Sequence, residues 1–157
     1  MRKSSKGFTL IELLAVIVIL AIIALITTPV ILNVLEESRL NSAKDKAWGT
    51  IDAVRVAYAT AQTGEQEIAI PYTVNFGTSE GSTTATNIGY GKINDTEIRV
   101  SGEKPTAGTV NLAADGTITA TSLKFGNYYC STIDGKNGSI NANKMYCSRT
   151  ADDVVSK

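Results

Sequence analysis

Very few side chains in this 157-residue sequence are suited to catalysis or metal binding. There is no histidine, so the usual general base at neutral pH and the commonest metal ligand are both missing. The two cysteines, Cys130 and Cys147, are too few for a zinc site made of thiolates alone. The composition therefore argues against zinc enzymes and histidine-based catalysis, and we expect neither enzymatic activity nor a cofactor.

One carboxylate occupies an unusual position. From Phe8 to Leu35, Glu12 is the only formally charged side chain in 28 residues, and Leu13 to Ile26 is entirely apolar. About 20 apolar residues span the ~30 Å hydrocarbon core of a bilayer as a helix. A carboxylate in such a helix costs about 2.5–3.5 kcal/mol on insertion scales, so it is expected to mark a partner or a pathway. The alternative is a Glu12 that lies near the membrane surface and keeps its charge in water.

A short basic segment precedes the apolar run. Arg2, Lys3 and Lys6 lie within residues 1–7, which contain no acid. Because basic residues stay on the cytoplasmic side of a membrane helix, the chain after Leu35 is expected outside the cytoplasm. The small-residue cleavage site of an ordinary secretory signal does not follow the apolar run. The sequence therefore predicts a precursor that crosses the cytoplasmic membrane once, with its N-terminus inside.

The junction between the basic and apolar segments reads KGFTLIE over residues 6–12. Over residues 6–37 the chain resembles the type IV pilins and the related pseudopilins. The resemblance implies that residues 1–7 are a leader, which a prepilin peptidase removes between Gly7 and Phe8, and that the new Phe8 amine is methylated. It also implies that Glu12 pairs with the Phe8 amine of a neighbouring subunit, and that pilus assembly machinery builds a filament from copies of the chain.

Pro29 lies inside the apolar helix, where it removes one backbone hydrogen bond and crowds the carbonyl of Leu25. A kink or a locally loosened turn is expected here. The resemblance implies that this stretch can unwind when a subunit leaves the bilayer for the filament, which makes Pro29 an assembly residue. The alternative is an ordinary membrane-helix kink, satisfied by the hydroxyls of Thr27 or Thr28.

The apolar helix is expected to continue as an amphipathic helix through residues 36–62. Apolar residues recur there every three or four positions, at Leu40, Ala43, Ala47, Ile51, Val54, Tyr58 and Ala61. Thr63-Gly64 is expected to end the helix, with the glycine near its C-terminal cap.

Short β-branched runs follow, separated by turn signals. They predict strands at residues 68–76, 97–100, 109–113, 117–123, 128–132 and 144–148. Asp115-Gly116 is a favourable hairpin turn, and TSEGSTTAT at residues 78–86 is expected to be an exposed loop. The sequence therefore predicts an α+β fold, in which the outer half of one long helix packs on a small antiparallel sheet of about four strands.

The expected organisation has three parts. Residues 1–7 form the cleaved leader, residues 8–35 the transmembrane and assembly helix, and residues 36–157 the extracytoplasmic domain. In that domain, residues 36–62 are the amphipathic helix, and residues 68–148 carry the sheet and a disulfide loop. The resemblance to type IV pilins implies that this arrangement is the type IV pilin fold.

Cys130 and Cys147 enclose 16 residues near the end of the outer domain. A disulfide is the simplest use of the pair outside the cytoplasm, and many type IV pilins have a similar C-terminal loop. The bond would be worth about 3 kcal/mol in the chain-entropy model and would pin the last strand to the sheet edge. Two buried free thiols are the alternative.

Oxygen-bearing side chains lie inside the same loop, at Asp134, Asn137, Ser139 and Asn141. Major pseudopilins can bind calcium near their C-terminal end. Lys136, however, occupies a position where an EF-hand loop needs an acid or an amide. We therefore interpret these residues as turn formers and expect no metal.

The predicted function is that of a structural pilin subunit, which polymerises into a type IV pilus on the bacterial surface for adhesion, motility or DNA uptake. Removal of the leader takes away three of 15 basic residues and none of 15 acidic ones, so no direct binding of nucleic acid is expected. Two alternatives stay open. One is a pseudopilin of a type II secretion system, and the other is a single-pass membrane-anchored domain that does not polymerise.

Overall fold

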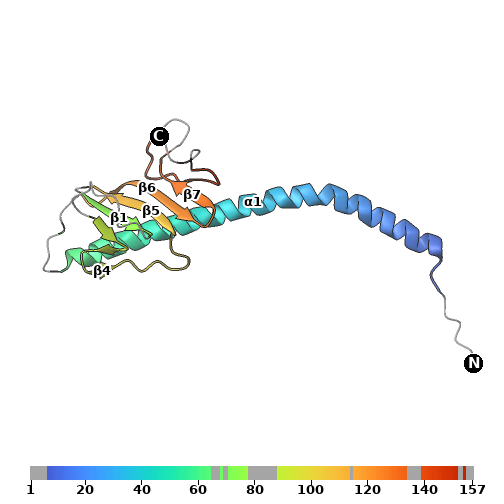
Figure 1. Cartoon of the computed structure of the whole chain (residues 1–157), viewed down its shortest axis with the longest axis horizontal. Coiled ribbons are helices and arrows are strands. Elements are labelled where there is room, and N and C mark those ends of the chain that lie inside the picture. Colours follow the sequence, from blue (N-terminus) through green and yellow to red (C-terminus); the bar gives the residue numbers. More distant parts are fainter. Residues whose placement is uncertain are drawn as a thin grey trace, which may run out of the picture. The chain divides into compact units, whose positions relative to one another are not determined.

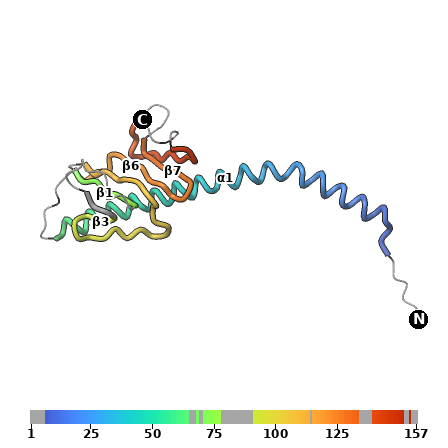
Figure 2. Tube along the Cα trace, viewed as in Figure 1, coloured from blue at the N-terminus to red at the C-terminus, as the bar shows by residue number. Residues whose placement is uncertain are grey.

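The computed structural model describes residues 7–64, 68, 71–77, 88–113, 115–133, 139–151 and 154. The chain divides into two compact units, residues 1–39 and residues 40–157, and each is described by itself. The first unit is helical, and the second combines the end of the same helix with a β-sheet (Figures 1 and 2).

One helix and eight strands make up the described secondary structure. The helix α1 covers Leu10–Gln62, 53 residues, and runs without interruption across the boundary of the two units. The strands are β1 (Tyr72–Phe76), β2 (Ile88–Tyr90), β3 (Lys92–Ile93), β4 (Thr96–Glu97), β5 (Ala107–Leu112), β6 (Ile118–Phe125), β7 (Tyr128–Ser131) and β8 (Tyr146–Ser148). The predicted α+β class is confirmed, with an apolar N-terminal helix and a small, mostly antiparallel sheet.

The helix of the first unit has no buried face. The buried residues of α1 begin only at Ala43, and the large apolar side chains from Phe8 to Leu35 are all exposed. This segment is long and apolar enough to cross a membrane. A surface of this kind is not stable in water and requires lipid or protein to cover it.

The sheet of the second unit is larger than predicted. Six strands pair in the order β2-β1-β5-β6-β7-β8, and β3 and β4 form a separate two-stranded hairpin. All pairs are antiparallel except β1 with β2, which is parallel. The prediction of about four antiparallel strands was therefore wrong in number and at one edge.

Short strands account for most of this difference. The run predicted at residues 97–100 forms a strand only at its first residue, in β4, where it pairs with β3 across a turn. Strand β2 has three residues, with a glycine at its centre, and so carries no alternating pattern. The exposed loop predicted at residues 78–86 lies outside the described residues.

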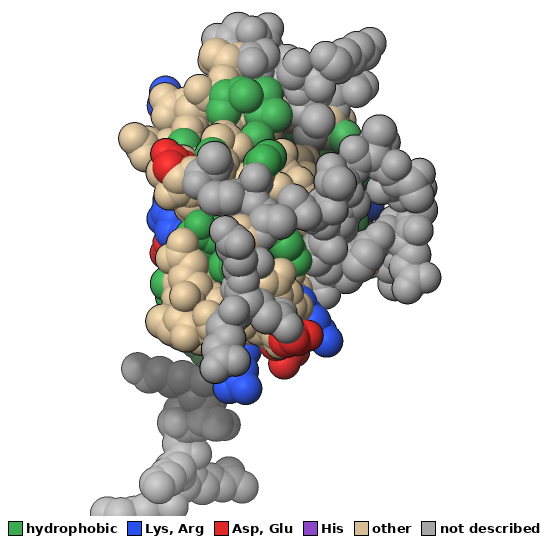
Figure 3. All heavy atoms as spheres, turned by 90° about the vertical axis from the view of Figure 1, so that its left-hand side faces the viewer, with side chains coloured by type: hydrophobic (Ala, Val, Ile, Leu, Met, Phe, Trp, Pro, Cys, Tyr) green, Lys and Arg blue, Asp and Glu red, His purple; other side chains and the backbone are tan. Residues whose placement is uncertain are grey.

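The core of the second unit lies between the end of α1 and one face of the sheet. Six of the seven predicted stripe residues of the helix are buried, and Leu40 is half-buried. Thr50 and Ala57 are buried as well, and Thr50 satisfies its hydroxyl by donating to the Lys46 carbonyl at 2.9 Å. On the view of this unit in Figure 3, hydrophobic side chains alternate with polar atoms, and both acidic and basic side chains appear along its edges.

The predicted Asp115-Gly116 turn connects β5 and β6. Thr117 donates from its amide and its hydroxyl to the Asp115 carboxylate, at 2.9 and 2.6 Å. These two hydrogen bonds lower the pKa of Asp115, the side-chain bond contributing most. A lowered pKa means that the turn is most stable above the ordinary pKa of aspartate and loses this contribution as the pH falls through the folded value.

A disulfide joins the last two strands. Cys130 on β7 and Cys147 on β8 are direct register partners with a Cα–Cα distance of 4.1 Å, and their sulfurs are bonded. Because β8 is the outermost strand of the sheet, the bond fixes an edge strand of only three residues, as predicted. The alternative of two free thiols is excluded in this structure.

Gly108 on β5 has no room for a side chain. Its φ is +126°, and an added Cβ would collide with the backbone of Ser122 on β6. Gly102 has a similar φ of +100° but open space around it.

We predict that Gly102→Ala lowers the free energy of unfolding by about 1–3 kcal/mol through backbone strain, and that Gly108→Ala lowers it by about 1–3 kcal/mol more, because its Cβ would also collide with the neighbouring strand. Thermal melting of the purified chain in detergent measures both, and equal effects would contradict this packing.

Loss of the disulfide should destabilise the second unit by about 3 kcal/mol. A loss of that size corresponds to a fall in Tm on the order of 10 °C for a domain of this length. Reductant should therefore lower the Tm of the parent chain, and a Cys130→Ala, Cys147→Ala double variant should melt early in either buffer. A parent chain that melts identically with and without reductant would show that the bond contributes nothing.

Candidate functional site

The residues predicted for leader cleavage lie just before α1. Gly7 and Phe8 precede the first helical residue, Leu10, and the Phe8 side chain is 90% exposed. A Cβ added to Gly7 would meet nothing within 4 Å. The packing of this chain therefore does not require glycine at position 7, and any requirement must come from a partner that approaches this peptide bond.

Glu12 belongs to a capping box at the start of α1. The Thr9 amide donates to Oε2 of Glu12 at 2.8 Å, and the Thr9 hydroxyl donates to the same oxygen at 2.7 Å. In return, the Glu12 amide donates to the Thr9 hydroxyl oxygen at 3.4 Å. Thr9 is thus the N-cap residue and Glu12 the third helical residue, so that each side chain satisfies an amide that the helix leaves unpaired.

The capping box satisfies hydrogen bonds but leaves the charge of Glu12 in place. Both bonds from Thr9 end on Oε2, so Oε1 is open to a further donor. No ion pair to Glu12 forms within the part of the chain that the structure describes. The carboxylate therefore has no counter-charge among the described residues, and an apolar environment would strongly destabilise its negative charge.

Pro29 does not interrupt the helix. The residues around it are all helical, and the hydroxyls of Thr27 and Thr28 donate to the carbonyls of Ile23 and Ala24 at 2.9 and 2.6 Å. These are the carbonyls just before that of Leu25, whose partner amide the proline lacks. The threonines therefore bond locally without replacing the missing bond, and Pro29 remains a weak point in the helical ladder.

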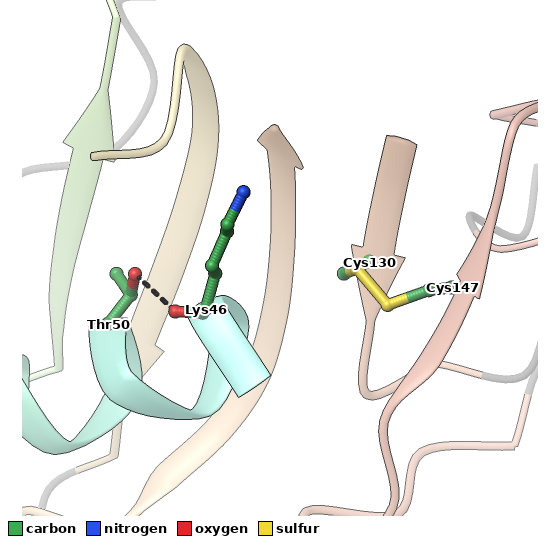
Figure 4. Close-up of a disulfide and its surroundings, with 4 residues drawn as sticks. All are labelled: Lys46, Thr50, Cys130 and Cys147. Atoms are coloured by element: carbon green, nitrogen blue, oxygen red, sulfur yellow. Dashed lines mark hydrogen bonds between the residues drawn. A yellow bond between two sulfur atoms is a disulfide. The ribbon is translucent and has the colours of Figure 1, made fainter. Parts of the chain in front are cut away.

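The cysteine pair lies far along the sequence from Glu12, in the second unit. Figure 4 shows the bond between Cys130 and Cys147, and the hydrogen bond from Thr50 to the Lys46 carbonyl. Cys130 is 1% exposed and belongs to the core cluster of the unit. This site is structural, because its two sulfurs are bonded to each other, with Cys130 buried and Cys147 partly buried.

The residues considered for calcium are only partly described. Asp134 and Asn137 lie outside the described residues. Asn141 uses its side-chain oxygen to accept from the Asn143 amide at 3.0 Å, as a turn-forming residue does. Among the described residues, no group of three or more acids or cysteines is placed to hold a metal ion.

Three features were missed by sequence reasoning. The Thr9 to Glu12 capping box has a legible signal, a threonine followed three residues later by glutamate before an apolar run. The ion pair between Lys46 and Glu103, at 2.6 Å, joins α1 to the loop before β5 and has no such signal. A groove between α1 and the chain after β4, lined in part by Asp52, Glu97 and Arg99, likewise depends on tertiary packing.

Comparison with curated proteins and with solved structures gave no significant match. Residues 2–28, however, match the family model described as the prokaryotic N-terminal methylation motif. These residues include most of the basic N-terminal segment, together with Gly7, Phe8, Thr9 and Glu12. The matched segment is the class III signal of type IV pilins and pseudopilins, a signal of structural subunits that a prepilin peptidase processes for a pilus-type system. The chain therefore carries the N-terminal methylation signal of the pilin and pseudopilin group at the head of a pilin-like α+β architecture.

Proposed function

We propose that the chain, after cleavage between Gly7 and Phe8 and methylation of Phe8, polymerises into a type IV pilus. The observation that supports this most strongly is the segment of residues 8–35, helical from Leu10 onward, which is apolar on every side and carries a single carboxylate. A helix of this kind suits two environments in turn, a bilayer before assembly and a bundle of identical helices afterwards. Nothing else in the described part of the chain packs against the apolar surface of residues 8–35.

The charge of Glu12 supports assembly over simple anchoring. A membrane anchor has no use for a carboxylate that disfavours insertion by about 2.5–3.5 kcal/mol. Cleavage creates the opposite charge, the Phe8 α-amine, at the same end of the helix. The amine of a neighbouring subunit can donate to the open Oε1, while Thr9 continues to bond Oε2. Such a pair would fix the axial register of adjacent subunits, because the two charges must meet at one height.

The proposed location follows from the same segment. The precursor lies in the cytoplasmic membrane, with the basic leader inside and residues 36–157 outside. Its partners are the prepilin peptidase, the assembly machinery and other copies of itself. The second unit then forms the surface of an extracellular filament, where its edge disulfide stabilises it, and the filament serves adhesion, motility or DNA uptake.

A pseudopilin of a type II secretion system is the second candidate, because it would carry the same signal. The disulfide favours the pilin, since in the alternative the C-terminal loop would be expected to hold calcium instead of a bond between Cys130 and Cys147. Melting with calcium, and separately with reductant, distinguishes them. A Tm raised by calcium and unaffected by reductant would favour the pseudopilin.

Leader removal tests the first step. Gly7→Ala should be processed, whereas Gly7→Trp should retain the leader, because the peptidase must approach this backbone closely. A Cβ added at position 7 meets nothing within 4 Å, so Gly7→Ala meets no obstacle among the described residues. Intact-mass analysis of the membrane-bound chain gives the N-terminus of each variant. A parent chain that begins at Met1, or one cut elsewhere, would end the proposal.

Glu12→Ala should abolish filaments without affecting the second unit. The Phe8 amine would enter the helix bundle without a counter-charge, and an unpaired buried charge costs several kcal/mol per subunit. We expect at least a tenfold loss of surface filaments, roughly the effect of 1.4 kcal/mol, at an unchanged level of membrane-bound subunit and an unchanged Tm.

Thr9→Val is the matched control, because it removes both hydrogen bonds of the Thr9 hydroxyl, the one donated to the Glu12 carboxylate and the one accepted from the Glu12 amide, and keeps the charge. It should retain most of the filament yield. Equal yields for Glu12→Ala and the parent would show that Glu12 only lies at the membrane surface. Equal losses for Glu12→Ala and Thr9→Val would show that helix capping, and not charge pairing, is what assembly needs.

A further inference from the structure

The six-stranded sheet has one face turned away from α1, which we call the outer sheet face. The end of α1 covers the opposite face, where Val74, Val110 and Leu123 are buried (Figure 1). The six strands contain no acidic residue, and Lys124 on β6 is the only charged residue in them. The strands therefore give the outer sheet face no carboxylate that would neutralise or repel a bound anion.

Uncharged polar side chains line up across this face. Direct register partners on neighbouring strands lie on the same face of a sheet. One row runs through Asn75 on β1, Thr109 on β5 and Ser122 on β6, and Thr73 and Asn111 form the next pair on the same face. All five are half-buried, and their side chains make no hydrogen bond within the described part of the chain. Their hydroxyls and amides can therefore both donate to and accept from a ligand.

Two lysines lie on this face near its β8 edge. Lys124 is the register partner of Tyr129, and its Nζ lies 5.0 Å from the centre of the Tyr129 ring. The Nζ of Lys144 lies 5.9 Å from the centre of the Tyr146 ring. Tyr146 shares the face of Tyr129, because its register partner is Ser131, two residues along β7. The two rings therefore hold both ammonium groups at the same face.

Neither ammonium group has a counter-charge. Lys124 and Lys144 form no ion pair within the described part of the chain. A tyrosine ring attracts an ammonium group through its quadrupole and leaves its net charge in place. Each lysine therefore still offers N–H donors and a positive charge to an anion.

The two features together favour an acidic polysaccharide as the ligand. Sugar hydroxyls both donate and accept, as the threonine, asparagine and serine side chains do, and uronate carboxylates complement the lysines. Single-stranded nucleic acid instead requires open aromatic faces for its bases and a groove of cations for its phosphates. Here a lysine lies over each tyrosine ring, and the face carries two lysines at one end only.

We propose that the outer sheet face binds an acidic polysaccharide. Its carboxylates contact Lys124 and Lys144, and its hydroxyls contact the row of Asn75, Thr109 and Ser122. This site goes beyond the proposed polymerisation and does not depend on it, because one chain carries all of these residues. On a filament it would supply a chemistry for adhesion to acidic surface glycans.

Binding of polygalacturonate to the purified full chain in non-ionic detergent tests the site. At low salt, a Lys124→Gln, Lys144→Gln double variant should bind about tenfold more weakly than the parent, because two exposed charge pairs are lost. The matched control is Lys44→Gln, Lys92→Gln, which removes the same charge on α1 and β3 and should bind like the parent. All three chains should share one Tm. A parent that does not bind, or equal losses in the two double variants, would overturn the proposal.

A second comparison tests the polar row and the kind of anion. Asn75→Asp, Asn111→Asp places two carboxylates on the outer sheet face and should also weaken binding about tenfold, by like-charge repulsion. Asn41→Asp, Gln62→Glu adds the same charge on exposed positions of α1 and should have little effect. Equal effects of these two variants would overturn the site. Polyphosphate of matched length that binds as tightly as polygalacturonate would overturn its assignment to a polysaccharide. Either result leaves the proposed pilus intact, because filament yield does not enter these measurements.

Discussion

The constraint on which the rest depends is the exposed apolar surface of residues 8–35. Its large side chains are between 46% and 90% exposed in the single chain, and none lies in a core. The hydrophobic effect, at about 25 cal/mol per Å² of apolar surface, makes such a surface in water very unfavourable. The segment must therefore always lie in lipid or against other helices. Insertion into a membrane would cover this surface with lipid, and packing into a bundle of helices would cover it with protein.

Glu12 is the one charged side chain of this segment, so its stability differs between a bilayer and a bundle of helices. In the single chain, Thr9 satisfies one carboxylate oxygen, while the charge itself has no partner among the described residues. A bilayer offers no counter-charge in its core, whereas in the proposed filament a neighbouring subunit would offer its N-terminal amine. The preference for assembly would then come less from apolar contacts, which lipid can also supply, than from the pairing of one charge per subunit.

The sequence was most informative where one physical requirement dominated. Uniform apolar character from Leu13 to Ile26 indicated the membrane segment, and the spacing of buried residues from Ala43 to Ala61 indicated the packed face of the same helix. The disulfide followed from two cysteines in a segment expected to lie outside the cytoplasm. Strands β2 and β3 were not predicted, and β4 was predicted only at Glu97, because segments of two or three residues carry little periodic signal and form where a neighbour offers its edge.

The candidate site shows the same division. Glu12 could be named from its charge within an apolar run, and Gly7 and Phe8 from the resemblance to type IV pilins. The capping role of Thr9 was missed, although the threonine-to-glutamate spacing carries its signal. The groove between α1 and residues 96–101 could not be predicted, because it forms where small helix residues happen to face the chain after β4. Val56, which lines this groove, has no signal that separates it from any other surface residue of an amphipathic helix.

Electron microscopy of filaments sheared from the cell surface, with mass identification of their subunit, tests the central claim most directly. The account predicts thin filaments composed of this chain, with a subunit that begins at a methylated Phe8. A chain found only in the membrane fraction of cells that process it normally, and absent from any surface filament, would contradict the account.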